Sequence, residues 1–551
     1  MALDTFNKRS RPAIFKKLAE EKFDLLVIGG GITGGSIFRD AALRGMKVAL
    51  VEAKDFASAT SGRSSKLIHG GLRYIKNLGL RLAWESCHER NLHIRLNKRL
   101  VRPLPFLVPL YRNRGEPRWL MRLGMILYEA LSGFNNHRFH RFLSREETLS
   151  LAPALPPEGL TGGCLYYDAV INDSRWTMEV IKDGVAQGGL AVNYSPVTQL
   201  LNQEKQIVGA RVYDELGGHC HDIRSRAVVN ATGIFSDQIR RLDHLDTSHT
   251  AKSHRLSKGT HLVFAEEDVP LSTTIVFSSP VDGRSLFLAK HEACFLYGTS
   301  DHWEEASPDL PIPARTDVEY LLMSLQQFMP EAQLNRSKVQ FVYSGFRPLL
   351  SNGDQSTLSS SVTREDYIDV SPSGLVSVVG GKLTTARITA ARVLAQVIKL
   401  IGRDHTWWEC KTDQVSIGGT NEAVAESLAY WVRRCPRLTS YFRVLYQRYG
   451  LDADEICAEV TRIHEDPGSD PTAEPIRAEV QYVCRHEMVC TLEDLIDRRA
   501  GFLYWNVEKR LERLRYGAHV IRAELDLTEA EFETQLLAYS EHLKRFHSLP
   551  E

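Results

Sequence analysis

The chain has 551 residues, of which 43% are hydrophobic and 25% charged, so it is long enough for two or three globular domains. Its 68 lysines and arginines balance its 68 aspartates and glutamates, which excludes a general attraction to nucleic acid or acidic lipid. The nine cysteines occur without a C-x-x-C pair, so we predict neither a zinc site nor a disulfide framework, and we expect no metal.

The N-terminal residues are basic and contain no apolar run of the length that a secretory signal needs. No stretch approaches the roughly 20 apolar residues of a membrane-spanning helix. Scattered free thiols fit a reducing compartment. We therefore expect a cytoplasmic protein, and contact with the inner face of the cytoplasmic membrane stays open.

Residues 23–53, FDLLVIGGGITGGSIFRDAALRGMKVALVEA, predict a strand, a glycine turn, a helix over residues 32–44 and a second strand. Gly29, Gly31 and Gly34 are in G-x-G-x-x-G register. Such glycines allow a tight turn, the approach of a pyrophosphate to the helix N-terminus, and close packing of helix on strand. Glu52 ends the second strand, where a carboxylate accepts hydrogen bonds from an adenosine ribose. A ligand-free glycine turn does not require this combination, so we predict a dinucleotide site.

Three later segments favour FAD over NAD as this dinucleotide. An NAD domain continues with short βα units, whereas here a hydroxyl-rich loop follows that can pass beneath a dinucleotide. Further along, a short strand ends in Asn-Ala-Thr-Gly, and another ends in a glycine pair that precedes a helix. The residues expected to contact the cofactor in these segments are Thr60, Ser61, Ser64, Ser65, Lys66, Ala231, Thr232, Gly233, Gly380, Gly381, Lys382, Leu383 and Thr384. For Lys66 the alternative to cofactor contact is an exposed position at the surface.

The motifs GGGITGG, SSKLIHGGLRY, NATG, KGTHLVF, GTSD, SGFRPLL and GGKLTTAR resemble, in order and spacing, those of FAD-dependent glycerol-3-phosphate dehydrogenases. The resemblance covers residues 22–400 and continues more weakly into the C-terminal region. It implies an α/β FAD-binding fold of the glutathione-reductase or D-amino-acid-oxidase type, an antiparallel-sheet substrate domain and a C-terminal helical domain.

We expect the FAD domain to be discontinuous, over about 22–80, 160–235 and 345–400. A basic helical insertion at 81–159 and a strand-rich part at 236–344 would form the substrate domain. The segments RLSKGTHLVF, TTIVFSS, SLFLAK and CFLYGTS read as strands of an antiparallel sheet that covers the flavin. Residues 405–551 show helical periodicity and form the helical domain.

The substrate implied by the resemblance is sn-glycerol 3-phosphate, which carries a phosphate dianion and a secondary alcohol. Cationic, forked donors are needed for the phosphate, and a base must take the hydroxyl proton as hydride leaves. The cations expected around the substrate are Arg73, Arg347, Arg364 and Lys382, and Tyr74 would orient the substrate hydroxyls. We expect Arg347, which precedes Pro348 in a predicted turn, to be the main phosphate ligand.

Two histidines compete for the role of base. His69 lies on the glycine turn of SSKLIHGGLRY, and His261 lies in KGTHLVF. We expect His69, Arg73, His261 and Lys382 to supply the catalytic groups, and the sequence does not decide which imidazole faces the substrate.

The sequence departs from the family pattern at two places. Ile234 and Phe235 follow NATG where the family has proline and an aromatic residue, and Lys290 and His291 precede GTSD where it has an apolar residue and proline. If the second pair reached the substrate pocket, its size and charge would differ.

Residues 97–131 alternate arginines with Leu, Phe, Trp and Met, which suits either an interfacial membrane surface or a packed helix with solvated arginines. Membrane contact would suit a quinone as electron acceptor. The alternatives are an oxidase that uses O2, a related enzyme acting on another polyol phosphate or an amine, and a non-enzymatic FAD-dependent regulator. A homodimer is compatible with the sequence, and no nucleic-acid partner is expected.

Overall fold

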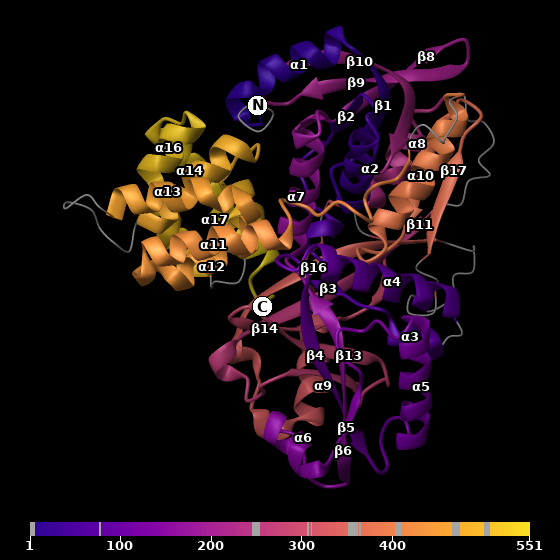
Figure 1. Ribbon diagram of the computed structural model, residues 1–551, viewed down its shortest axis with the longest axis vertical. Helices are drawn as coiled ribbons and strands as arrows, with labels where there is room; N and C mark the ends of the chain where they lie inside the picture. The colour runs from indigo at the N-terminus through magenta and orange to yellow at the C-terminus, as the bar shows by residue number, and fades with distance from the viewer. Residues whose placement is uncertain are drawn as a thin grey trace.

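The computed structural model of the protein describes residues 6–76, 79–244, 254–305, 308–309, 311–350, 362, 365–402, 409–464, 474–500 and 507–550. Two β-sheets lie end to end, and a helical domain, orange to yellow in Figure 1, lies at their side. This arrangement agrees with the fold class expected from the sequence.

In the described part of the chain, the first sheet contains eight strands in the order β17-β18-β10-β1-β2-β7, and β9 and β8 extend it from β10. The strands from β18 to β7 along this path are parallel, and β17 is antiparallel to β18. Their bounds are β1 Lys22–Ile28, β2 Val48–Val51, β7 Leu190–Val192, β8 Val197–Gln203, β9 Gln206–Asp214, β10 His219–Asn230, β17 Asp366–Val370 and β18 Leu375–Gly380.

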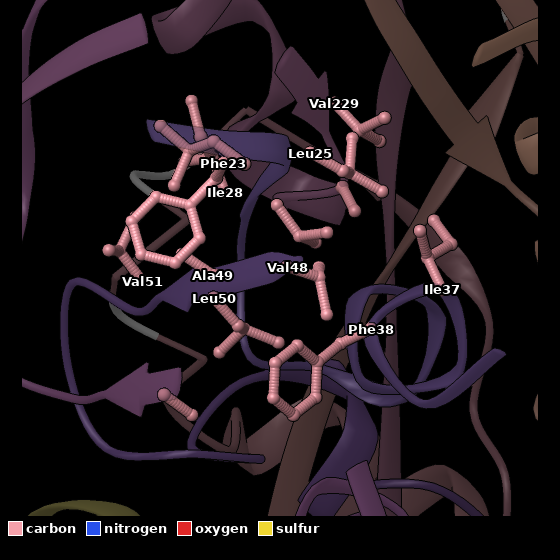
Figure 2. Packing of buried hydrophobic residues seen from close by; sticks show 14 of the residues in the cluster. Phe23, Leu25, Ile28, Ile37, Phe38, Val48, Ala49, Leu50, Val51 and Val229 are labelled. Carbon is pink, nitrogen blue, oxygen red and sulfur yellow. The ribbon is translucent and has the colours of Figure 1, made fainter. Parts of the chain in front are cut away.

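The parallel strands are apolar on both faces because helices cover both sides of this sheet. Leu25 and Val48 are almost completely buried. Figure 2 shows side chains of β1 and β2 packed towards Ile37 and Phe38 of the helix that follows the glycine turn. This helix, α2, spans Ile32–Leu43 and ends one residue before the predicted boundary.

A second sheet has ten strands in the described residues, in the order β15-β11-β14-β13-β12-β4-β6-β3, with β16 on β11 and β5 on β6. It is antiparallel except for the β4–β12 pair. Its strands are β3 Leu67–Ile68, β4 Arg102–Tyr111, β5 Arg141–Leu143, β6 Leu160–Val170, β11 His254–Ala265, β12 Thr274–Ser278, β13 Ser285–His291, β14 Cys294–Gly298, β15 His302–Glu304 and β16 Val339–Leu350. The four strand segments predicted between residues 255 and 300 are therefore confirmed.

Two expectations about this sheet were wrong. Residues 102–111 form the strand β4 inside the insertion that we expected to be helical, because alternate side chains of this segment pack into the second sheet. In addition, β6 and β16 belong to the second sheet, although all of β6 and the second half of β16 fell within segments assigned to the FAD domain. Pairing partners decide such membership, and they are not visible in a local pattern.

The helices around the two sheets are α1 Arg11–Glu20, α2 Ile32–Leu43, α3 Leu72–Lys76, α4 Leu80–Leu96, α5 Arg118–Leu131, α6 Arg145–Leu151, α7 Asp173–Ala186, α8 Ser236–Arg240, α9 Arg315–Phe328 and α10 Ala386–Leu400. The helical domain contains α11 Asn421–Arg434, α12 Thr439–Tyr449, α13 Ala453–His464, α14 Glu474–His486, the π-helix η12 Asp494–Arg499, α15 Val507–Tyr516, α16 Ala518–Leu525 and α17 Glu529–Phe546. None of the helices in these described residues has the length and apolar character needed to cross a membrane.

The helical domain has its own hydrophobic core and is joined to the first sheet by buried ion pairs. Arg175 of α7 donates two hydrogen bonds of 2.7 Å to the Glu487 carboxylate, which Lys182 also contacts at 3.0 Å. Arg499 makes a similar fork to Asp55, just after β2. Removing one partner of such a pair leaves a buried charge, so these contacts fix the position of the domain.

Candidate active site

A cavity of about 1100 Å³ lies where the two sheets meet. It is lined by the ends of β1, β2, β10 and β18 on one side and by strands of the second sheet on the other. The carboxyl ends of parallel strands are where open α/β sheets bind ligands. The predicted cofactor segments therefore meet at one place.

The glycine turn after β1 needs glycine for two geometrical reasons. Gly29 has φ +112°, and a Cβ there would lie 2.6 Å from the Ala231 carbonyl oxygen at the end of β10. At Gly34 a Cβ would lie 1.9 Å from the Gly29 carbonyl oxygen, so Gly34 permits the close packing of α2 and does not itself line the cavity. Gly31 caps α2 and lines the cavity.

Glu52 stands at the end of β2 on the wall of the cavity. Its Oε2 accepts the Gly30 N–H at 2.6 Å, and its Oε1 accepts the Lys54 N–H at 2.9 Å. Burial raises the pKa of this carboxyl, and the two backbone donors act in the opposite direction. The position suits the predicted role of acceptor for ribose hydroxyls.

The hydroxyl-rich loop follows the cavity, and its side chains are held by residues distant in sequence. Ser61 Oγ accepts the Ile32 N–H at 2.9 Å at the start of α2. Thr60 donates to the Phe346 carbonyl oxygen at 2.8 Å, and Ser65 contacts His261 at 2.9 Å. The predicted residues of this loop that line the cavity are Thr60, Ser61, Ser64 and Ser65.

Lys66 differs from the prediction that it contacts the cofactor or lies at the surface. Its side chain is fully buried, and its ammonium group pairs with Asp173 at the start of α7. Ser64 Oγ donates to the same carboxylate at 2.7 Å. Lys66 thus holds the loop in place through a buried ion pair and does not line the cavity. The sequence did not single out Asp173, because nothing local marks it as the partner of a loop about 110 residues earlier.

The later segments also reach the cavity. It is lined by Ala231, Thr232, Gly233, Gly380, Gly381, Lys382, Leu383 and Thr384, the residues of these segments for which we predict cofactor contact. Ile234 and Phe235 line it as well. Lys290 instead pairs with Glu266, and His291 is buried with Nε2 2.8 Å from the Ile171 carbonyl oxygen. Lys290 and His291, which depart from the family pattern, are therefore not part of the cavity wall.

Arg347 lies on the cavity wall within β16, not in the turn that we predicted. Its Nη2 donates to Thr299 Oγ1 at 3.1 Å, and its Nη1 lies 3.6 Å from Asp301. Arg284, which sequence reasoning missed, lines the cavity beside it and donates to the Thr299 and Asp301 carbonyl oxygens at 3.2 and 3.1 Å. An arginine in a hairpin loop has no distinguishing local signal.

Lys382 and Tyr74 meet at another part of the wall. The Lys382 ammonium nitrogen lies 3.6 Å from the centroid of the Tyr74 ring and 3.0 Å from Ser86 Oγ. Both residues line the cavity. Arg73 belongs to α3, but its side chain, like Arg364 as a whole, lies outside the described residues.

The two candidate bases differ in environment. His261 is fully buried, stacks on Tyr343 and is 2.9 Å from Ser65 through Nε2. Burial, reinforced by Arg347 and Lys66, lowers the pKa of His261 to about 3. His69 is half-buried on the cavity wall, with its ring 6.3 Å from that of Tyr74. The structure brings both imidazoles to one cavity.

The turn that carries His69 is fixed by a second aspartate missed in the sequence. Asp168 of β6 accepts the Gly70 N–H at 3.1 Å. The same carboxylate oxygen accepts hydrogen bonds of 2.6 Å from Arg90 and Tyr128. These three contacts hold the glycine pair next to His69 in a defined position.

Comparison with known proteins identifies the class. Residues 24–396 match the family model described as FAD dependent oxidoreductase, and residues 410–532 match that described as the C-terminal domain of alpha-glycerophosphate oxidase. The chain belongs to the family of FAD-dependent oxidoreductases, which confirms the predicted fold class and cofactor.

The chain is also similar over its whole length to particular enzymes. It is 30% identical over 557 aligned positions to the aerobic glycerol-3-phosphate dehydrogenase of Staphylococcus aureus strain USA300, covering 99% of this chain and 97% of that one. The glycerol-3-phosphate dehydrogenase of Bacillus halodurans, solved with FAD, matches with a TM-score of 0.80 at 27% identity, covering 99% and 98% of the two chains. L-alpha-glycerophosphate oxidase from Mycoplasma pneumoniae matches with a TM-score of 0.52 at 16% identity over 70% of this chain and 96% of that one, which shows a shared fold.

The residues present fit FAD. The bare backbone at Gly29 and Gly31, the start of α2 and the Glu52 carboxylate form a continuous wall of the cavity. Anions bind favourably at such a helix N-terminus, and the carboxylate suits a ribose. The glycine pair at the end of β18 lines the same side of the cavity, where a planar ring can approach the backbone.

Gly31→Val should abolish FAD retention, because its side chain would occupy the place where the pyrophosphate approaches the helix start. Even a Cβ there lies 3.0 Å from Ser61 Oγ. The measurement is the ratio of flavin to protein absorbance after gel filtration. The matched control is Gly124→Ala, where an added methyl meets nothing within 4 Å. Full FAD occupancy in the valine variant would contradict the cofactor assignment.

Proposed function

We propose that the protein oxidises sn-glycerol 3-phosphate to dihydroxyacetone phosphate and passes the electrons through FAD to a quinone in the membrane. The observation that carries this proposal is the position of Arg347 on the wall of the cavity that the FAD-binding segments also line. A guanidinium group binds a phosphate through two parallel hydrogen bonds. The full-length similarity to aerobic glycerol-3-phosphate dehydrogenases supports the same substrate.

The phosphate would be held by Arg347, with Arg284 and Lys382 adding positive charge to the cavity wall. Asp301 lies 3.6 Å from Arg347 and keeps the guanidinium in place before substrate arrives. This arrangement favours a substrate with a dianionic end over an uncharged polyol. Tyr74, beside Lys382, supplies a hydroxyl for the polar remainder of the substrate.

Oxidation of the secondary alcohol removes a hydride from C2 and a proton from its hydroxyl, which leaves the ketone. When bound, FAD supplies the acceptor for the hydride. We assign the proton to His69, because it is half-buried on the cavity wall. His261, with a pKa of about 3, is a weak base and serves instead as a neutral hydrogen-bonding group next to Ser65.

The quinone part of the proposal is supported by α5, whose outer face is apolar. Trp119, Leu123 and Ile126 expose 64%, 56% and 49% of their surfaces, while the guanidinium groups of Arg118 and Arg122 stack on the ring of Phe142. Basic residues around an exposed apolar helix face suit the boundary between lipid headgroups and acyl chains.

The same helix connects the bilayer side with the catalytic cavity. Met121 of α5 lines the cavity, together with Val108 and Leu110 of β4. An apolar wall of this kind offers a path for a lipid-dissolved quinone, whereas oxygen would need no such helix. In Figure 1, α5 runs along the outer edge of the second sheet, away from the helical domain.

Arg347→Ala should weaken glycerol 3-phosphate binding by roughly ten- to a hundredfold, because a lost charge-assisted contact costs about 1.5–3 kcal/mol. FAD content should stay unchanged. The measurement is the apparent dissociation constant from anaerobic flavin reduction. Arg315→Ala, which removes an exposed arginine paired with Glu319, is the control. Unchanged affinity in the Arg347 variant would move the phosphate site to Arg284 or Arg364.

His69→Ala should slow anaerobic flavin reduction by about 10²- to 10⁴-fold, the usual effect of losing general acid–base help. FAD content should be retained, because Asp168 holds the turn through the Gly70 backbone and not through the imidazole. His261→Ala is measured in parallel by stopped-flow at saturating substrate. If only the His261 variant reduces slowly, the base lies on β11 and our assignment is wrong.

The double variant Leu123→Glu, Ile126→Glu should lose co-sedimentation with vesicles of phosphatidylcholine and phosphatidylglycerol, and lose activity with a long-chain quinone in them. Its flavin should still be reduced by glycerol 3-phosphate at the wild-type rate, since neither residue lines the cavity. Leu537→Glu, at a position on α17 that is 67% exposed, is the control. Unchanged quinone activity in the double variant would contradict the role of α5, and rapid hydrogen peroxide release by the wild type without quinone would favour the oxidase.

A further inference from the structure

Outside the catalytic cavity, two histidines and an aspartate converge where the last helix of the chain ends. His542 and His547 lie at the C-terminal end of α17, and Asp497 lies in η12. One potential ligand atom from each lies within 4.8 Å of the other two. Asp497 Oδ2 is 3.7 Å from His542 Nε2 and 3.9 Å from His547 Nε2.

These spacings are close to those of a metal centre. Ligand atoms 2.0–2.1 Å from a tetrahedral zinc ion lie about 3.3 Å apart, so the two histidine nitrogens would each approach Asp497 Oδ2 by about half an ångström on binding zinc. His542 Nε2 is buried and has no hydrogen-bond partner in the described part of the chain. This nitrogen lies 3.7 Å from the Asp497 carboxylate oxygen, beyond hydrogen-bond distance, and a cation bound between them would satisfy both buried atoms.

The surrounding groups match the outer shell that metal-binding histidines usually have. His542 Nδ1 lies 3.5 Å from the Glu493 carboxylate, which can orient the ring by accepting its other N–H. The second oxygen of Asp497 accepts the Tyr539 hydroxyl at 2.5 Å and lies 3.5 Å from Arg510, so Oδ2 remains directed at the histidines.

We propose that Asp497, His542 and His547 bind one zinc ion, with a water molecule as the fourth ligand. Two imidazoles and one carboxylate favour zinc over calcium or magnesium, which prefer oxygen ligands alone. The site is independent of the proposed function. It also departs from our expectation of no metal, which rested on the absence of cysteine motifs.

The local charge is relevant to this site. A metal ion binds the lone pair of a neutral imidazole. Arg510 and Arg63 bring positive charge near the site, and the carboxylates of Asp497 and Glu493 oppose it.

The site would fasten the end of the chain to the catalytic part. The His547 carbonyl oxygen accepts the Val342 N–H of β16 at 3.0 Å, and β16 is the strand that carries Arg347. The chain terminus lies between the helical domain and the second sheet (Figure 1). A zinc ion here would therefore join η12 to the end of α17, which the His547 backbone connects to β16.

The test is zinc binding to the holoenzyme after treatment with EDTA. Equilibrium dialysis against zinc, followed by elemental analysis, should give one zinc per FAD in the wild type and no binding of calcium. Asp497→Asn and His542→Gln should each lose this zinc. His486→Gln, a histidine of the same domain that pairs with Glu455 at 3.0 Å, should retain it.

FAD content and circular dichroism establish whether the variants are folded, and Asp497→Asn keeps the acceptor for Tyr539. Zinc should also raise the melting temperature of the wild type and of His486→Gln, and leave both ligand variants unchanged. Absence of stoichiometric zinc in the wild type, or equal zinc in the wild type and both folded ligand variants, would overturn the proposal.

Discussion

The site depends on the close approach of two backbones, the turn after β1 and the end of β10. Gly29 lies against the Ala231 carbonyl oxygen so closely that a Cβ would come within 2.6 Å of it. Gly34 allows α2 to come equally close to Gly29. This packing places the start of α2 beside the ends of β2, β10 and β18, and so creates the wall that suits a dinucleotide.

Two buried carboxylates complete the site, one in β6 of the second sheet and one at the start of α7. Asp173 holds the hydroxyl loop through Ser64 and Lys66, and Asp168 holds the turn after His69 through Gly70. Asp168 lies shortly before α7, and Asp173 is its first residue. The same helix contacts Glu487 of the helical domain through Arg175. Buried charges of this kind are costly unless fully paired, so they define one position for the loop. The catalytic loop is thus coupled to the docking of the C-terminal domain.

Local sequence sufficed where a residue's place follows from a strand, turn and helix pattern. The glycine turn, the Glu52 strand end and the glycine pair before Lys382 all lie on the cavity wall. Prediction failed where long-range pairing decides. Residues 102–111 read as part of a helical insertion but form β4, because β6 and β12 supply neighbours on both sides. Lys66 reads as a loop residue, but it is buried in an ion pair with Asp173. Arg284 is recognised as a site residue only in the structure, where its side chain donates to the Thr299 carbonyl oxygen.

The central claim is that the cavity binds a phosphorylated secondary alcohol next to FAD. The most direct measurement is anaerobic titration of the purified yellow protein with sn-glycerol 3-phosphate, glycerol and L-proline, followed by flavin absorbance. We predict that glycerol 3-phosphate bleaches the flavin completely at substrate concentrations where the other two compounds leave it oxidised. Reduction by glycerol or by the amino acid with equal efficiency, or no reduction by glycerol 3-phosphate, would contradict the account.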